Sequence, residues 1–305
     1  MPTSPYKLPI EGSPATPYLV SEATGNDQDV SNSGADRTVP ANLSTPKLGN
    51  LTLTAAKLGT RVLVSAEATE QLIVPILPYV RGQIELGLAN GIEDATINGD
   101  TAGTHMDTDV TAANDYRKAW DGYRKHSPSA TKIVGNGTGV IDVVLDLRKL
   151  RTAMGKYAIN TGDCPIIAGP RSYAMMLSMR DGSNPSPVMT IEKYGPNATI
   201  LTGELARVDG QPIIVSEFVR EDLGTTGVYT GGTVDRTMFL MVNRRSFVYG
   251  DFRPPSIKSR EIIETDQIAL VILARMTFNN WFGGQANQPL GAQTVAGYCY
   301  NFKPI

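Results

Sequence analysis

The stretch PYVRGQIELGLANGIEDATINGD, residues 78–100, holds the longest regular pattern in the chain. Apolar residues recur at steps of three and four along it and just before it, at Leu77, Val80, Ile84, Leu88, Ile92 and Ala95. This spacing predicts a helix over residues 76–98, about 33 Å long, with one apolar side that faces a core. Gly99 follows the last periodic residue and is expected to end the helix in a left-handed conformation.

The end of this stretch also resembles a calcium-binding loop. Asp94, Asn98 and Gly99 occupy the first position, the fifth position and the turn glycine of the pattern D-x-[DN]-x-[DN]-G-x5-E. Thr96 stands at the third position and His105 replaces the glutamate at the twelfth, so two ligands are missing. The residues therefore favour a helix end, and no metal site is expected.

The amino-acid composition limits the classes of protein to which the chain can belong. The chain has 305 residues, 41% of them hydrophobic, which predicts a globular protein of about two domains. Its net charge of -2 offers no general basic surplus for binding nucleic acid. Charged residues make up 19%, below the ~25% typical of soluble domains, as expected where copies of the chain cover one another.

The N-terminal residues and the cysteines indicate the compartment in which the chain is synthesised. Cys164 and Cys299 form no disulfide framework, which fits synthesis in a reducing compartment. The first residues, MPTSPYKLPIEGSP, lack the basic and apolar parts of a signal peptide. The longest apolar run, residues 268–274, is strand length and well short of the ~20 residues of a membrane span. No membrane contact is expected.

Residues 1–50 hold seven of the twenty prolines and show no helical period. A segment of this kind is either a disordered tail or an arm that becomes ordered on a neighbouring subunit. Leu51, Leu53 and Ala55 then alternate on one side of an extended chain that continues through Val62 and Val64.

The remaining elements mix without a regular βαβ alternation, so the predicted fold class is α+β. Further helices are predicted at 66–74, 139–154 and 170–182. Strands are predicted at 164–169, 211–218, 237–242, 246–250, 256–264 and 267–278, with a last strand through Tyr298, Tyr300 and Phe302. Residues 182–211 are rich in glycine and proline and are expected to form a loop.

Motifs that carry chemistry are scarce. Gly135, Gly137 and Gly139 lie between a short strand and a helix, which is the outline of a phosphate cradle. Their spacing is G-x-G-x-G and no Lys-Ser/Thr pair follows, so a flexible turn is favoured over a nucleotide site. The only histidines, His105 and His126, have no partners at metal-ligand spacing.

Two clusters need a choice between a functional and a structural interpretation. The acidic and basic residues of EFVRED could pair carboxylates for acid–base chemistry, but a turn in solvent is favoured: Glu217, Arg220, Glu221 and Asp222. Met175, Met176 and Met179 could form an adaptable binding surface, but a place in the core is favoured. No catalytic, cofactor-binding or metal-binding residues and no cofactor are expected, which favours a structural role over an enzyme.

Four stretches in order carry a resemblance to a known family: residues 51–71, 78–100, 164–183 and 206–219, which read LTLTAAKLGTRVLVSAEATEQ, PYVRGQIELGLANGIEDATINGD, CPIIAGPRSYAMMLSMRDGS and ARVDGQPIIVSEFV. Over roughly 45–280 the chain resembles the major capsid proteins of tailed bacteriophages, with the Hong Kong 97-type fold. The resemblance implies a shell of hexamers and pentamers that forms an icosahedral head around double-stranded DNA.

The resemblance also implies a division of the chain. The implied parts are an N-terminal arm at 1–30, an extended hairpin or E-loop at 31–64, a peripheral domain at 65–100 and 240–280, an axial domain at 101–239 and a C-terminal segment at 281–305. The chain would be a virion component that assembles in the cytoplasm of the host bacterium. Its partners would be itself, a portal protein at one vertex, separate scaffolding and decoration proteins where present, and packaged DNA through weak contacts.

Two departures from the family pattern qualify this picture. No charged helical segment precedes the arm, so a scaffold is expected either to be a separate protein or to lie outside the given sequence. Lys47 or Lys57 could supply the lysine of an isopeptide crosslink, but the strand at 265–276 contains no asparagine, so no covalent crosslink is expected. The alternatives are an encapsulin-like nanocompartment shell, which shares the fold, and a nucleotide-binding enzyme built on residues 135–139.

Overall fold

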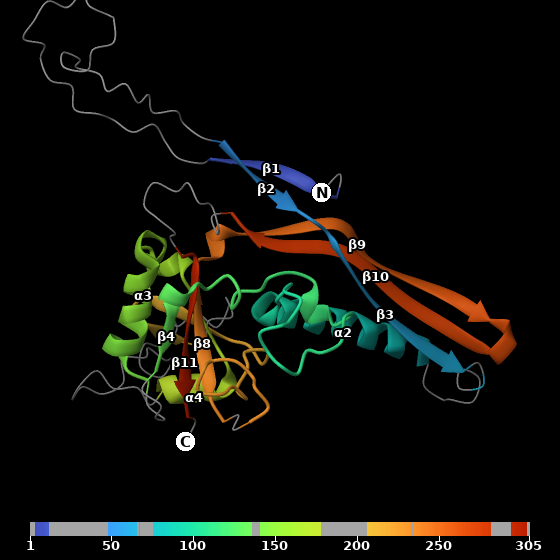
Figure 1. Ribbon diagram of the computed structural model, residues 1–305. Helices are drawn as coiled ribbons and strands as arrows, with labels where there is room; N and C mark the ends of the chain where they lie inside the picture. The colour runs from blue at the N-terminus through green and yellow to red at the C-terminus, as the bar shows by residue number, and fades with distance from the viewer. Residues whose placement is uncertain are drawn as a thin grey trace, which may run out of the picture.

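The computed structural model of the chain describes residues 4–11, 48–65, 67, 76–135, 141–177, 206–232, 235–281 and 294–303. These residues form three sheets (Figure 1). A long three-stranded sheet with one helix along it makes a projecting arm, and a six-stranded sheet with shorter helices makes the rounded body. A two-stranded ladder leaves the end of the arm nearest the body.

The helix of the arm, α2, covers Ile76–Asn98, as the apolar spacing predicted. Its predicted stripe is the side that meets the sheet: Ile84, Leu88 and Ala95 are buried, and Leu77, Val80 and Ile92 are partly buried against the same cluster. The predicted short helix at 66–74 lies outside the described residues, except for Glu67.

Gly99 ends α2 for a different reason from the one predicted. The prediction of a left-handed glycine is wrong, because the glycines with positive φ among the described residues are Gly155, Gly210, Gly227 and Gly231. A Cβ on Gly99 would collide with the backbone oxygens of Ala95 and Trp120. The residue is therefore a glycine because two backbone segments meet there.

Gly99→Ala is expected to lower the free energy of unfolding by about 1–3 kcal/mol, since the colliding atoms are backbone and cannot rotate away. Gly87→Ala is the matched control, because a Cβ there meets no atom within 4 Å and the change should be neutral or stabilising by about 0.5–1 kcal/mol. Urea unfolding of both variants measures the difference; equal midpoints would contradict this assignment.

The sheet of the arm has the order β3-β10-β9, with β3 at Ala56–Ser65, β10 at Gln267–Asn280 and β9 at Phe247–Ile262, all antiparallel. The prediction of two strands at 246–250 and 256–264 is wrong, because β9 runs unbroken between them. Pro254 and Pro255 are tolerated there because β9 is an edge strand and its register shifts beside them.

The two-stranded ladder joins β1 (Tyr6–Glu11) to β2 (Leu48–Leu53), from Tyr6 opposite Leu53 to Glu11 opposite Leu48. Its apolar side chains Ile10, Leu51 and Leu53 are buried with Val248 and Trp281 of the same chain. Neither alternative considered for residues 1–50, a disordered tail or an arm ordered on a neighbour, holds for β1, which is ordered against its own chain. Residues 12–47 lie outside the described part.

The body is built on the sheet β4-β11-β8-β5-β7-β6. Its strands are Lys132–Val134 (β4), Ala296–Phe302 (β11), Thr237–Val242 (β8), Ile166–Ala168 (β5), Gln211–Val215 (β7) and Ala206–Val208 (β6). The strand β6 corrects the predicted loop at 182–211, because it lies within that range and pairs with β7. Residues 178–205 are outside the described part.

Helices cover one face of this sheet. They are α3 (Lys149–Met154), which continues a π-helical stretch η3 (Val143–Arg148) within the predicted 139–154 helix, and α4 (Pro170–Leu177). Single 3-10 turns lie at Tyr116–Lys118 (η1), Ser129–Thr131 (η2), Gly155–Ala158 (η4), Thr161–Asp163 (η5), Arg244–Ser246 (η8) and Ile263–Thr265 (η9). Met175 and Met176 lie in the core, as predicted.

The other face of the sheet meets the end of α2. Ile97 packs there with Val219, Leu223 and Leu240. Because both faces are covered, all six residues of β8 are buried, and the five after Thr237 form a continuous apolar run rather than an alternating pattern. The arm and the body are thus joined where α2 ends.

Candidate functional site: the junction between the two sheets

A buried ion pair lies at the centre of the junction. Arg124 Nη1 is 2.6 Å from Asp107 Oδ2, and Nη2 is 3.1 Å from Oδ1, a two-pronged contact. Both side chains are 0% exposed. The pair lies within residues 100–127, and no sequence pattern distinguished these two residues from their neighbours.

The remaining hydrogen bonds of the pair tie three segments together. Arg124 also donates to Asn98 Oδ1 at the end of α2 and to the carbonyl of Gly227, each at 3.0 Å. The backbone N–H of Tyr229 donates to Asp107 Oδ1 at 2.9 Å. One ion pair therefore fixes the helix end, the 100–127 loop and the 216–230 segment against one another.

Two further arginines and their carboxylate partners lie around this pair. Arg220 lies 2.9 Å from Asp109, 2.7 Å from Asp222 and 3.4 Å from Asp107. Arg117 in turn lies 3.0 Å from Asp109 and 3.1 Å from Asp115. The prediction that EFVRED forms a turn in solvent is wrong for Arg220, whose side chain is 11% exposed. Asp222 is paired with Arg220 and Glu221 with Arg171, whereas Glu217 is exposed.

The residues of the calcium-like pattern converge on the same place but bind protein donors. Asp94 accepts hydrogen bonds from Asn98 Nδ2 at 2.6 Å and from the Tyr116 hydroxyl at 2.7 Å. Burial and the Asp94 carboxylate raise the pKa of Tyr116 to about 12, so it stays a donor. His105 Nδ1 accepts from the N–H of Asp107. Within the described ranges no three His, Cys, Asp or Glu side chains are grouped as metal ligands.

The charges of the junction shift the carboxyl pKa values. Burial acts to raise the pKa of Asp107, but the guanidinium groups of Arg124 and Arg220 outweigh it and hold that pKa below its ordinary value. The pKa values of Asp109 and Asp115 are lowered in the same way, against burial, by Arg220 and Arg117.

These shifts predict acid lability. A folded-state pKa below the unfolded value gives stability that is present at neutral pH and lost as the pH falls from about 5 through the folded pKa. Asp146 opposes this, because burial raises its pKa, but it is one group against several. Thermal unfolding between pH 7 and 3 should show a falling midpoint, and Asp107→Asn should flatten the slope. A midpoint that rises on acidification would contradict this.

The other sequence candidates lie elsewhere. The ring of His126 lies against Phe247 and Phe278, its Nδ1 is 2.9 Å from Asn280 Nδ2, and burial lowers its pKa. A Cβ on Gly135 would strike the Phe302 ring, so this glycine permits β11 to pass close by. Residues 136–140, which hold the rest of the Gly-rich turn, are outside the described part.

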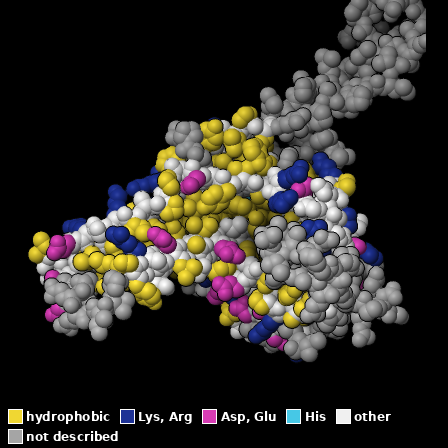
Figure 2. Space-filling view, turned by 180° about the vertical axis from the view of Figure 1, so that it is seen from behind, with side chains coloured by type: hydrophobic (Ala, Val, Ile, Leu, Met, Phe, Trp, Pro, Cys, Tyr) yellow, Lys and Arg dark blue, Asp and Glu magenta, His cyan; other side chains and the backbone are white. Residues whose placement is uncertain are grey.

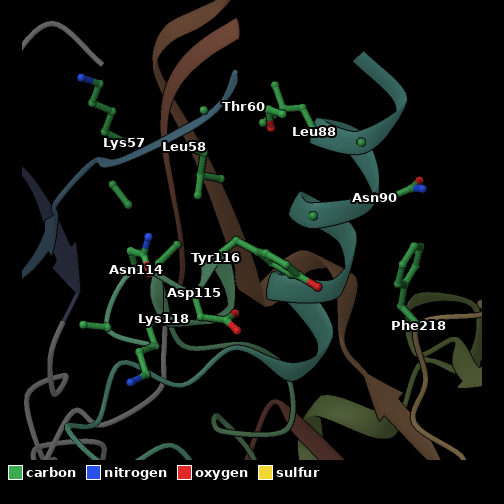
Figure 3. A pocket seen from close by; sticks show the side chains of 16 residues that line it. Lys57, Leu58, Thr60, Leu88, Asn90, Asn114, Asp115, Tyr116, Lys118 and Phe218 are labelled. Atoms are coloured by element: carbon green, nitrogen blue, oxygen red, sulfur yellow. The ribbon is translucent and has the colours of Figure 1, made fainter. Parts of the chain in front are cut away.

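An open groove of about 750 Å³ borders the junction, between β3, α2 and residues 113–119 (Figure 3). Leu58 of β3 and Leu88 of α2 line it, and Tyr116 lies across its floor. The Asp115 carboxylate at its side is already bound to Arg117, so it is not available as a base. The groove is shaped by packing and holds no poised acid–base pair among its described residues.

No helix in the described ranges is both long and apolar enough to cross a bilayer. The thiols of Cys164 and Cys299 are buried and form no disulfide, and burial raises their pKa values.

The junction itself holds paired charges, and these fix the two sheets relative to each other.

Solved structures share the architecture just described. A chain from Mycobacterium phage Bobi matches with a TM-score of 0.60 and 15% identity, over 98% of this chain and 86% of that one. A chain from Microbacterium phage Oxtober96 gives 0.62 and 14%, over 100% and 88%. The capsid of a native GTA particle computed with C5 symmetry gives 0.61 and 11%, over 98% and 85%. The fold is therefore the mixed α and β fold of phage capsid structures.

A similarity in amino-acid sequence points to the same class of protein. The major capsid protein of Escherichia phage T5 is 23% identical over 162 residues, which are 53% of this chain and 32% of that protein. The chain thus spans about a third of the length of this relative. No protein-family model matches. The resemblance to phage major capsid proteins predicted from the sequence is confirmed.

Proposed function

We propose that this chain is a major capsid protein, which assembles into hexamers and pentamers and so forms an icosahedral head shell around double-stranded DNA. The observation that carries the proposal is the likeness over 98% of the chain to a subunit of a GTA capsid, at a TM-score of 0.61. The match to the phage T5 major capsid protein supports it independently, from sequence.

The proposed division of the subunit follows its sheets. The arm with α2, β3, β9 and β10 would be the peripheral domain, and the six-stranded sheet, including β11, would be the axial domain. The β1–β2 ladder favours an extended hairpin that begins at Tyr6 and returns at Leu53, earlier than the 31–64 E-loop expected from the sequence. In this proposal the buried pair Arg124–Asp107 keeps the two domains at a fixed angle, so that rings of subunits can close.

The proposed partners are other copies of the chain, a portal protein at one vertex, packaged DNA, and separate scaffolding or decoration proteins where these exist. The proposed location is the virion, after assembly in the cytoplasm of the host bacterium. A role without catalysis fits a junction whose carboxylates are bound to arginines.

Purified chain is expected to elute as rings or as megadalton particles, and electron microscopy of that fraction should show closed shells. Nuclease-protected DNA inside particles from infected cells would distinguish a phage head from a nanocompartment, which would hold protein cargo. A compact monomer or dimer that binds ATP or NAD would overturn the proposal and support an enzyme.

The same particles test the crosslink. Because residues 265–276 contain no asparagine and those of β10 lie at its end, at Asn279 and Asn280, boiled particles should run as a single monomer band on a denaturing gel, near the 32.8 kDa of the chain. A ladder of multimers would show that Lys47, Lys57 or another lysine forms a covalent bond between subunits.

A further inference from the structure

A histidine lies where the arm meets the body. Residues 100–127 follow α2, and His126 stands near their end, against the start of β9 and the end of β10. Its backbone N–H donates to the carbonyl of Gly122 at 3.0 Å, and its side chain is partly buried. Figure 2 shows hydrophobic side chains on the surface between the projecting arm and the body, and among the described side chains no histidine is visible on that face.

Aromatic rings surround the imidazole. The centre of the His126 ring lies 5.7 Å from that of Phe247, the first residue of β9, and 6.3 Å from that of Phe278 in β10. The two phenyl rings stack at 5.3 Å, and Tyr123 meets both of them edge-on, at 4.9 and 5.3 Å. The imidazole therefore belongs to a four-ring cluster that joins the 100–127 loop to both strands of the arm hairpin.

Only one nitrogen of the imidazole has a hydrogen-bond partner among the described residues. Nδ1 lies 2.9 Å from Nδ2 of Asn280, which is the last residue of β10 and is 2% exposed. Nε2 is buried and has no partner in the part of the chain that the structure describes. An uncharged imidazole fits this setting, because its Nδ1 can accept a hydrogen bond from the amide of Asn280.

Protonation of the ring breaks this arrangement. An imidazolium carries a proton on both nitrogens and accepts no hydrogen bond. The proton on Nδ1 of His126 would face the amide group of Asn280 that donates to it, and the proton on Nε2 would be buried without an acceptor. Burying a charge without partners is unfavourable. The folded protein therefore binds this proton poorly, and burial lowers the pKa of His126 accordingly.

The charged groups around the ring do not offset this cost. Asp121 acts to raise the pKa of His126, but burial outweighs it. Lys125, and Arg245 ahead of β9, are each bound to a carboxylate, at 2.9 and 3.0 Å. Of the described residues, those that β9 and β10 place against the ring do not titrate: Phe247, Phe278 and Asn280.

The contact lies where the chain crosses between the arm and the body. β8 of the body leads into β9, and β10 is followed in the chain by β11 of the body. The N–H of Trp281, next to Asn280, donates to the carbonyl of Ser246 at 2.8 Å, so the two crossings run side by side. Displacement of His126 would remove a contact of the 100–127 loop with both crossings. Because the arm projects from these crossings (Figure 1), a small rotation here moves its far end by more.

We propose that His126 is a pH switch between the arm and the body: the uncharged ring holds the 100–127 loop against the start of β9 and the end of β10, and the protonated ring releases them. The switch is a property of the single subunit, whereas its effect on particles rests on the proposed shell function.

The direction of the response follows from linkage. A base whose folded-state pKa is lowered gives stability that is present above the unfolded pKa, ~6.5 for histidine, and is lost as the pH falls below it. The release is therefore expected to begin below about pH 6.5 and to precede the loss at Asp107 and its neighbours, which begins at about pH 5.

Tryptophan fluorescence reports on both sides of the contact, because the chain has two tryptophans, Trp120 in the loop and Trp281 next to Asn280. Emission of the wild-type protein should change in one step between about pH 6.5 and 5, and in a second step below about pH 5. His126→Asn cannot be protonated and keeps an acceptor for Asn280, so it should lose the upper step and keep the lower one. His126→Phe, whose ring suits the aromatic cluster, should do the same.

The other histidine provides the matched control. His105 also has a buried Nε2 without a partner among the described residues, and its Nδ1 accepts from the N–H of Asp107. His105→Asn keeps that acceptor and should retain both steps. Loss of the upper step in His105→Asn, with its persistence in His126→Asn, would place the pH response at the centre of the junction and overturn the proposal.

Deuterium exchange at the imidazole C2 carbon, read by mass spectrometry, tests the switch without any substitution. His126 of the wild-type protein should titrate below the usual pH for histidine, and its titration should coincide with the upper fluorescence step. A ring that titrates without a fluorescence change, or an upper step that remains in both His126 variants, would overturn the proposal.

Particles test the consequence for the shell. At pH 5.5 wild-type particles should lose closed shells several-fold faster than particles of His126→Asn, as followed by light scattering and electron microscopy. Equal rates would limit the switch to the free subunit and overturn its proposed effect on the shell. If the wild-type protein forms no particles at any pH, the shell function fails, while the fluorescence steps still decide the switch.

Discussion

Arg124→Met is expected to lower the free energy of unfolding by about 3–5 kcal/mol, since it leaves the Asp107 carboxylate buried and unpaired. The same change removes donors from Asn98 and from Gly227, so three segments lose a common contact. Denaturant titration monitored by circular dichroism measures the loss, and the particle yield should fall with it.

Two comparisons make this result specific. Arg148→Met removes an ion pair to Asp209 whose arginine side chain is 46% exposed, and should cost about 1 kcal/mol or less. Arg124→Met combined with Asp107→Leu should be less destabilising than Arg124→Met alone, because no buried charge is then left without a partner. If the double variant is less stable than Arg124→Met alone, the loss of stability comes from packing and not from the unpaired charge.

The second large effect is expected at Phe239 in the middle of β8. Its side chain is fully buried and its ring lies 5.6 Å from that of Phe302, nearly parallel to it. Phe239→Ala should therefore cost about 3–5 kcal/mol through lost burial and the cavity left behind.

An exposed aromatic residue provides the control for Phe239. Tyr79→Ala on α2 removes a ring that is 64% exposed and should change stability by no more than about 0.5 kcal/mol beyond helix propensity. Comparable losses in the two variants would mean that the sheet of the body does not hold the core described above.

Local patterns accounted for much of the fold. The apolar spacing between Leu77 and Ala95 gave α2 its bounds, and the proline at position 170 gave α4 its start, because each depends on residues close in sequence. The same reasoning failed at β9, where Pro254 and Pro255 indicate a break. Only the position of β9 at the sheet edge explains why the strand continues.

The junction could not be predicted in this way. Arg124 and Asp107 are 17 residues apart, and Gly227 lies 103 residues from Arg124. A polar loop contains several Asp and Arg residues, and nothing local tells a solvated one from a buried one. Asp94 and Asn98 were recognised in a calcium-like pattern, but the hydrogen bonds that Asp94 accepts from Asn98 and Tyr116 were not predicted.

The sequence by itself determined the long helix, the α+β class and the resemblance to capsid proteins, since these follow from periodicity and from the order of short motifs. Only the tertiary structure decided that Gly99 is a backbone contact, that the carboxylates of the junction are paired, and that His126 lies against the start of β9 and the end of β10. Pairing and register bring together residues that are distant in the chain. The free energy of a buried charge depends on the groups that surround it in space rather than on its sequence neighbours.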